Sequence, residues 1–268
     1  SLAPPPWAST RRKSTKIAFR DQVRKMDSMV WVYVSHHRAG VELLRHLAQE
    51  HVNFLNVSSC MHDGDLGWAP AGCTEAPQVL GVRIWFFTTN LLMNKYEPVW
   101  GKQDYRILHI TRDPLDMVVS ACIHRASALG GAPPSLEKQR SEPQKEGVAM
   151  EVEAILNTSG ADMLEVAQNR TSDRMLAVRF EDFARSSMGF DFAAMRLYSF
   201  ALGDALGRTA LVKLLADASK HDLRRHPENH EPGNVARASG KARVKKAINR
   251  LPHSMLRRLN ELRMKLGY

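Results

Sequence analysis

The chain has 268 residues, of which 44% are apolar and 25% are charged, and its formal net charge is +10. This length suits one large α/β domain, and no apolar run approaches the roughly 18 residues that a membrane-spanning helix needs. The 3 cysteines form neither a metal-binding pattern nor a dense disulfide framework, so a zinc module and a small disulfide-stapled scaffold are both excluded.

Strand-like and helix-like runs alternate along the chain. We expect the proline-rich, basic residues 1–26 to form a flexible or peripheral arm and residues 27–268 to form a single domain. Short β-branched and aromatic runs predict buried strands, and longer amphipathic runs predict helices. The predicted strands cover 29–34, 52–57, 81–87, 106–111 and 175–179, the predicted helices cover 41–49, 114–129, 148–168 and most of the chain after 183, and loops are predicted over 58–78 and 132–146. This alternation predicts an α/β fold with a central parallel β-sheet flanked by helices on both faces.

The segment from Tyr105 to Ser120 is the most informative stretch. An apolar strand ends at Arg112-Asp-Pro, and Ser120 follows about two turns into the next helix, whose first turn tolerates the proline. Arg112 therefore lies at the carboxyl end of a strand, where open α/β sheets bind ligands. A guanidinium and a hydroxyl that converge there suit a phosphate group. The alternative is that Arg112 merely pairs with Asp116 across the turn.

The pattern Arg112-Asp-Pro-x-Asp-x-x-x-Ser120 resembles the 3′-phosphate-binding segment of the sulfotransferase family. Members of that family use 3′-phosphoadenosine-5′-phosphosulfate (PAPS) as the sulfuryl donor. The resemblance implies that Arg112 and Ser120 hold the 3′-phosphate. It also implies the P-loop NTPase-like sulfotransferase fold and chemistry without a metal.

The segment Arg38-Ala39-Gly40-Val41-Glu42 resembles the family's 5′-phosphosulfate loop, Lys/Arg-Ser-Gly-Thr-Thr, which precedes an apolar helix. Backbone N–H groups at such a helix start, together with one cation, can enclose an anion. The resemblance implies that all five positions contact the donor and that Arg38 is catalytic, steadying the sulfuryl group and the leaving phosphate. The loop departs from the pattern because Ala39, Val41 and Glu42 replace the usual hydroxyl side chains.

Two later segments match the family in order. Phe180-Glu-Asp follows the strand over 175–179 and resembles the family's Tyr-Glu-Asp segment, which implies that Phe180 contacts adenine; simple packing at a strand end is the alternative. The late loop is similar to the family's Arg-x-Gly-Lys loop over the 3′-phosphate. The resemblance implies phosphate contacts for Arg237, Ser239, Gly240 and Lys241.

The general base is not evident. Small-molecule sulfotransferases use a histidine after the third strand, and Thr88 stands at that place here. We favour His62 as the catalytic base because the ordinary pKa of histidine suits proton transfer near neutrality. Asp63, Glu75 and Glu42 are the alternatives, as is a merely solvated His62. The aromatic residues Trp68, Trp85, Tyr96 and Trp100 either line an acceptor pocket or belong to the core.

Together the resemblances run from residue 29 to the end and predict a PAPS-dependent sulfotransferase acting on a hydroxyl or amine of a small-molecule or carbohydrate acceptor. The alternative is a catalytically degenerate protein of the same fold that binds a nucleotide or an anionic polymer. Nucleic acid is disfavoured as a partner because only the net charge points to it.

Two features bear on the compartment. The chain as it stands carries no secretory signal, and we expect a cytoplasmic protein. The chain does not begin with Met, and many carbohydrate-acting members carry an N-terminal anchor, so the Golgi lumen is the alternative. Cys60 and Cys73 could pair only in an oxidising compartment.

Overall fold

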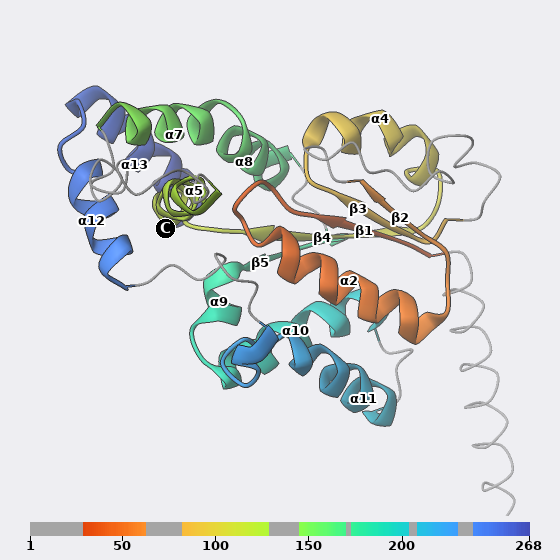
Figure 1. Ribbon diagram of the computed structural model, residues 1–268. Helices are drawn as coiled ribbons and strands as arrows, with labels where there is room; N and C mark the ends of the chain where they lie inside the picture. The colour runs from red at the N-terminus through yellow and green to blue at the C-terminus, as the bar shows by residue number, and fades with distance from the viewer. Residues whose placement is uncertain (1–28, 63–81, 129–144, 170–172, 204–207, 230–237) are drawn as a thin grey trace, which may run out of the picture.

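The computed structural model describes residues 29–62, 82–128, 145–169, 173–203, 208–229 and 238–268 (Figure 1). Among these residues, five strands form one parallel sheet in the order β2-β3-β1-β4-β5. The strands are β1 (Val30–Val34), β2 (Ser59–His62), β3 (Ile84–Phe87), β4 (Tyr105–Thr111) and β5 (Met175–Arg179). The predicted parallel sheet is confirmed, whereas the predicted N-terminal arm lies outside the described residues.

Helices cover both faces of the sheet (Figure 1). One face packs against α2 (Val41–Leu55), α10 (Ser187–Leu202) and α11 (Arg208–Ala218). The other face packs against α4 (Asn90–Trp100) and α8 (Ser159–Asn169). A third apolar cluster joins α5 (Pro114–Ala128), α7 (Lys145–Asn157), α12 (Ala238–Ile248) and α13 (His253–Lys265). The short helices are α9 (Phe180–Ala184), η3 (Ser219–His221) and η4 (Pro227–Asn229).

The central strand β1 is buried over its whole length. Trp31 and Tyr33 pack toward α2 and α10, whereas Val30, Val32 and Val34 pack toward α4. Successive side chains of a strand point to opposite faces, so a strand that is covered on both sides must be apolar at every position. The sequence of β1 meets this requirement, and the predicted strand over 29–34 is confirmed.

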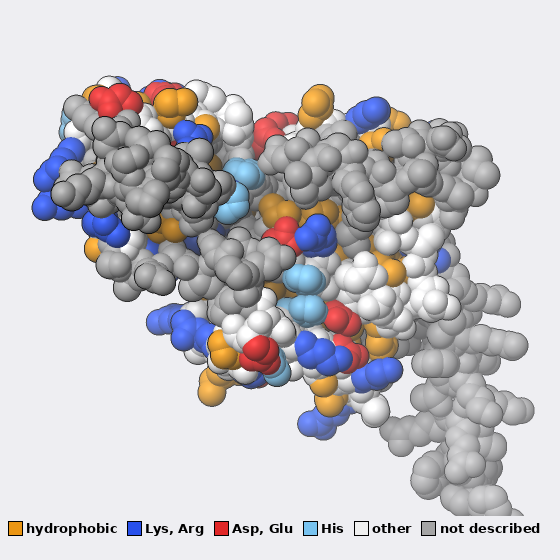
Figure 2. Space-filling model, viewed as in Figure 1, with side chains coloured by type: hydrophobic (Ala, Val, Ile, Leu, Met, Phe, Trp, Pro, Cys, Tyr) orange, Lys and Arg blue, Asp and Glu red, His pale blue; other side chains and the backbone are white. Residues whose placement is uncertain are grey.

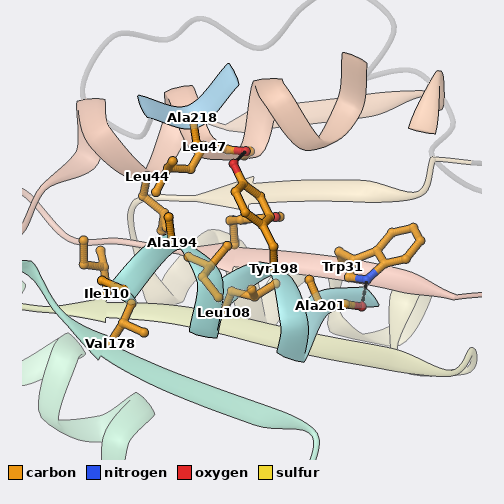
Figure 3. Packing of buried hydrophobic residues seen from close by; sticks show 14 of the residues in the cluster. Trp31, Leu44, Leu47, Leu108, Ile110, Val178, Ala194, Tyr198, Ala201 and Ala218 are labelled. Atoms are coloured by element: carbon orange, nitrogen blue, oxygen red, sulfur yellow. Dashed lines mark hydrogen bonds between the residues drawn. The ribbon is translucent and has the colours of Figure 1, made fainter. Parts of the chain in front are cut away.

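Buried aromatic side chains fasten α10 to its neighbours through their polar atoms. The Trp31 indole N–H donates to the carbonyl oxygen of Ala201 at 2.6 Å, and the Tyr198 hydroxyl donates to that of Leu47 at 3.0 Å (Figure 3). A buried polar atom without a partner costs free energy, so these bonds allow large aromatic side chains inside the core. As a result, α10 is tied both to β1 and to α2.

The predicted strand over 52–57 is wrong. Helix α2 continues to Leu55 and ends at Asn56, whose left-handed conformation (φ 51°) places its N–H on the Val52 carbonyl. The buried residues Leu44, Leu47, Ala48 and His51 recur at helical spacing, and Leu55 extends this face against the core. Packing of that face outweighs the strand preference of the local sequence. The second strand lies later, at Ser59–His62, inside the predicted loop over 58–78.

Two helical predictions need correction. The predicted helix over 148–168 is interrupted between α7 and α8, where the Thr158 hydroxyl donates to the Ala154 carbonyl at 2.6 Å. A side chain at Gly160 would lie 2.6 Å from Leu262, so α13 packs closely at this break. Helix α4 was not predicted: Pro98 lies inside it, although Met93, Tyr96 and Trp100 recur at helical spacing and pack on the core.

Three of the four aromatic residues that could have lined a pocket belong to the core. Trp85 and Trp100 are buried, and Tyr96 packs on the same cluster, while Trp68 lies outside the described residues.

Cys60 is disulfide-bonded. Cys122 is a free thiol, and burial raises its pKa to about 12. Within the described ranges, no helix is long and apolar enough to cross a membrane, and no group of three or more His, Cys, Asp or Glu side chains could hold a metal ion.

Candidate functional site

The loops after β1 and β4 meet at the carboxyl edge of the sheet. The two strands are parallel neighbours, with Val34 beside His109, so the residues that follow them leave the sheet side by side. The Arg112 side chain crosses this gap, and its Nη1 donates to the carbonyl oxygen of Arg38 at 2.9 Å. The structure therefore brings together the two sequence motifs that were expected to form one site.

Backbone conformation prepares the first loop for close approach by a ligand. Arg38 and Gly40 both have positive φ, at 64° and 100°, and the Ala39 N–H donates to the carbonyl of His36 at 2.8 Å. Helix α2 then begins at Val41, with Gly40 as a cap that has no side chain to satisfy the first amides. The first N–H groups of a helix lack partners within the helix and carry partial positive charge, so they suit an anion.

The Phe180 ring contacts both the loop after β1 and the loop after β4. A side chain at Gly40 would lie 2.6 Å from the Phe180 ring, and the Arg112 guanidinium lies over the same ring, 4.4 Å from its centroid. The ring therefore packs against Gly40 of the first loop and carries the Arg112 guanidinium over one face. The predicted contact between Phe180 and adenine would have to use the remaining surface of the ring, and it stays a prediction.

Arg112 is a largely enclosed cation with unused donor capacity. Its Nε is buried and has no hydrogen-bond partner among the described residues. Burial lowers the pKa of Arg112, Arg38 adds to this shift, and Asp116 and Glu181 oppose it. Asp116 does not form the pair with Arg112 that the alternative interpretation required, because its carboxylate forms an ion pair with Lys245 of α12 at 3.0 Å. Arginine stays protonated in this setting, so the guanidinium is a fixed charge.

The start of α12 packs near α5, the helix that carries Ser120. Ser120 is half-buried on α5, and a side chain added at Gly240 would lie 3.8 Å from Ile123, almost one turn further along α5. Lys241 is exposed beside Gly240. The side chain of Ser239 and all of Arg237 lie outside the described part of the chain. The roles of these residues toward a phosphate stay predictions.

Of the candidates for proton transfer, the structure describes the Glu42 side chain and the backbone of His62. Glu42 is exposed and forms an ion pair with Arg45 on its own helix, so its carboxylate already has a cationic partner. His62 ends β2 and is in register with Phe87, which places its backbone at the same carboxyl edge of the sheet. Its side chain, Asp63 and Glu75 are not among the described features, so the identity of the base stays a prediction.

Two histidines that the sequence reasoning missed adjoin Arg38. The Arg38 Nε donates to His37 Nε2 at 3.1 Å. His124, one turn after Ser120 on α5, has its pKa lowered by burial and by the charges of Arg38 and His37. Several histidine side chains reach the surface in the view of Figure 2, near the middle of the molecule. The His-His-Arg sequence directly after the strand β1 could have indicated this cluster.

A buried histidine pair lies behind the first loop and was also missed. The Nε2 atoms of His36 and His109 are 3.1 Å apart, and both residues are fully buried. One ring must donate and the other accept, so the pair is neutral in complementary tautomers. Burial lowers the pKa of both, that of His109 to about 3, and the pair links the loop after β1 to β4. A single histidine within the apolar β4 sequence was the only local sign.

Comparison with known proteins gives the fold. Neither a protein-family model nor a curated protein sequence matches the chain. The mouse sulfotransferase SULT7A1 complexed with PAP is similar over 92% of this chain and 89% of its own, with a TM-score of 0.54 and 14% identity. The sulfotransferase domain of the Synechococcus PCC 7002 olefin synthase is similar over 90% of this chain and 94% of its own, with a TM-score of 0.43 and 13% identity. Because its structure is similar to that of SULT7A1, the chain has the sulfotransferase fold, as the sequence motifs predicted.

We predict that Gly40→Ala disrupts the first loop. The new methyl group would lie 2.6 Å from Phe180 at a positive φ of 100°, so the loop or the ring must shift. We expect a loss of roughly 1–3 kcal/mol in the free energy of unfolding, measured by urea denaturation. The matched control is Gly147→Ala in α7, where no atom lies within 4 Å of the new methyl group, and it should be neutral or stabilising. Equal stability of Gly40→Ala and the native protein would contradict this packing.

We predict that stability falls as the pH drops from 7.5 to 5.5. His36, His51 and His109 have lowered pKa values in the fold, those of His51 and His109 about 3, against an unfolded value of 6.5. The unfolded chain therefore binds protons that the folded chain does not, so stability is fully present above pH 6.5 and is lost below it. Each histidine should cost about 1 kcal/mol over this interval. Urea unfolding measures the loss, and a His36→Leu, His109→Leu double variant should lose most of the pH dependence.

Proposed function

We propose that the protein is a PAPS-dependent sulfotransferase that transfers a sulfuryl group to a hydroxyl or amine of a small-molecule or carbohydrate acceptor. The observation that carries the proposal is the 2.9 Å hydrogen bond from Arg112 to the carbonyl of Arg38. It joins the segments that resemble the 3′-phosphate and 5′-phosphosulfate motifs, within a sulfotransferase fold. The solved structure of similar fold is complexed with PAP, which supports a related ligand here.

The residues present fit a donor with two separated anionic groups. The amide groups from Gly40 to Glu42 and the Arg38 side chain would hold the 5′-phosphosulfate. Arg112, Ser120 and the start of α12 would hold the 3′-phosphate, with Arg237, Ser239, Gly240 and Lys241 as its contributors. The buried Arg112 Nε without a described partner supports this assignment, since an orphaned donor in a cationic site is suited to an anion.

Catalysis would rest on positioning and charge. When bound, PAPS supplies a sulfuryl group that is open to in-line displacement by the acceptor. Arg38 would stabilise the negative charge that develops on the leaving phosphate, and such electrostatic contacts are typically worth roughly 100–1,000-fold in rate. His62, at the carboxyl end of β2, would take the proton from the acceptor. Metal ions have no role in this proposal.

The second candidate is a catalytically degenerate protein of the same fold that binds a nucleotide or an anionic polymer. Specific observations favour it. Val41 and Glu42 replace hydroxyl side chains, Glu42 is engaged with Arg45, and a buried Thr88 stands where a histidine is usual. Donor binding without sulfuryl transfer would support this alternative.

Concerning the compartment, the disulfide at Cys60 favours an oxidising environment such as the Golgi lumen over the cytoplasm.

We predict that 3′-phosphoadenosine 5′-phosphate (PAP) raises the melting temperature of the protein and that ADP raises it less. A ligand that binds only the folded state stabilises it by mass action, so PAP at 100 times its dissociation constant adds about 2.7 kcal/mol. Arg112→Ala should abolish the preference for PAP because it removes the cation assigned to the 3′-phosphate. Differential scanning fluorimetry measures both effects.

The matched control is Arg258→Ala, which removes the same charge from an exposed ion pair with Glu153 on α7. Its PAP shift should equal that of the native protein, which would separate a site effect from a net-charge effect. A native protein without any shift in millimolar PAP would contradict donor binding. An Arg112→Ala variant with an unchanged preference for PAP would contradict the assigned 3′-phosphate site.

We predict that His62→Ala keeps PAP binding and loses sulfuryl transfer from radiolabelled PAPS by roughly 100-fold or more, as removal of a general base does. The measurement needs an acceptor screen with the native protein first. His226→Ala is the matched control, because His226 pairs with Glu228 on a surface turn. Native turnover in His62→Ala would exclude His62 as the base and direct attention to Asp63, Glu75 and Glu42.

A further inference from the structure

The end of α13 fixes the residue that follows Arg112. Arg263 donates from Nε and Nη2 to the two carboxylate oxygens of Asp113, each at 2.8 Å. Asp113 Oδ1 also accepts the Leu115 N–H at 2.9 Å, which caps the start of α5. A bidentate pair of this kind holds the orientation as well as the position of a carboxylate. The C-terminal helix therefore restrains the turn that presents Arg112.

Tyr268 holds a second carboxylate at the same place. Its hydroxyl donates to Glu181 Oε2 at 3.2 Å, while Glu181 Oε1 accepts the Asp113 N–H at 3.0 Å. Thr111 Oγ1 lies 3.1 Å from the Tyr268 oxygen and 3.5 Å from the Val178 carbonyl oxygen, and its single hydrogen can be donated to either. Both oxygens of Glu181 are thus occupied by fixed donors.

The tyrosine itself is held in place by the turn at the end of α13. Gly267 has a φ of 81°, which lets the chain reverse so that the Tyr268 N–H donates to the Arg263 carbonyl at 2.9 Å. Arg179 donates to the Gly267 carbonyl at 2.7 Å, and its guanidinium lies 4.9 Å from the centroid of the Tyr268 ring. The ring position therefore depends on the backbone turn and a cation–π contact, and the hydroxyl is left to bind Glu181.

Glu181 lies within electrostatic reach of Arg112. Burial lowers the Arg112 pKa, and Glu181 is one of the nearby charges that oppose this shift. The Arg112 Nε is buried without a partner among the described residues. If Glu181 lost the Tyr268 hydroxyl as its donor, an ion pair between its carboxylate and Arg112 would be favourable. Such an ion pair would neutralise the cation that the proposed site offers to an anion.

We propose that Tyr268 is a positioning residue: its hydroxyl keeps Glu181 directed away from Arg112, so that the guanidinium is available to the 3′-phosphate of the nucleotide. This inference rests on the proposed function, because it concerns the same phosphate site. It assigns selectivity for a 3′-phosphate to the contact between Tyr268 and Glu181, which acts through Arg112. Arg263 supports the arrangement through Asp113.

The test compares the dissociation constants of PAP and ADP, measured by isothermal titration calorimetry. Tyr268→Phe keeps the ring and its contact with Arg179 but removes the hydroxyl. PAP affinity should fall about tenfold, on the order of one charge-assisted hydrogen bond, whereas ADP affinity should not change. The double variant Tyr268→Phe, Glu181→Gln should recover the PAP affinity. A neutral glutamine cannot neutralise Arg112, and its oxygen can still accept the Asp113 N–H.

The matched control is Tyr105→Phe, which makes the same change at the amino end of β4 and should leave both affinities unaltered. Unchanged ADP affinity in Tyr268→Phe serves as the check that the variant folds. Three outcomes would overturn the inference and leave the proposed function intact. Tyr268→Phe could bind PAP as tightly as the native protein does, or it could lose affinity for PAP and ADP equally. The PAP affinity lost in Tyr268→Phe could also fail to return when Glu181→Gln is added. A native protein that binds PAP no better than ADP would overturn the 3′-phosphate site, and the inference with it.

Discussion

The pairing of β1 with β4 is the constraint on which the site depends. It aligns Val34 with His109 at the carboxyl edge, so that the loops carrying Arg38 and Arg112 leave the sheet together and one hydrogen bond can join them. The pairing requires an apolar β1 that is covered on both faces, and the helix layers meet that requirement. The core and the site are therefore parts of one arrangement, and the buried His36–His109 contact links them.

The carboxylates around Arg112 are held by partners of their own, and this keeps the cation available. Asp113 pairs with Arg263, Asp116 with Lys245, and Glu181 with the Tyr268 hydroxyl. Arg112 itself contacts a carbonyl oxygen and the face of Phe180. An anion site can thus exist among acidic residues, because each negative charge is directed elsewhere. This distribution is the physical basis for our proposal that the site binds a phosphorylated nucleotide.

Much of the fold could be predicted from local sequence, and the parts that could not depend on distant contacts. The strands over 29–34, 106–111 and 175–179 follow from apolar composition, although β5 at the sheet edge is buried only at Val178, and Arg112 stands where a strand and a proline-started helix predict it. The strand expected over 52–57 is helix because its apolar face packs on a core that the local sequence does not reveal. The contacts of Tyr268 with Thr111 and Glu181 join residues far apart in the chain, which no local pattern encodes.

A crystal structure of the protein with PAP would test the central claim most directly. The account predicts the 5′-phosphate at the amide groups of the start of α2 and the 3′-phosphate within hydrogen-bond distance of the Arg112 guanidinium, with Glu181 still bound to Tyr268. PAP bound elsewhere on the molecule, or a 3′-phosphate that does not contact Arg112, would contradict it.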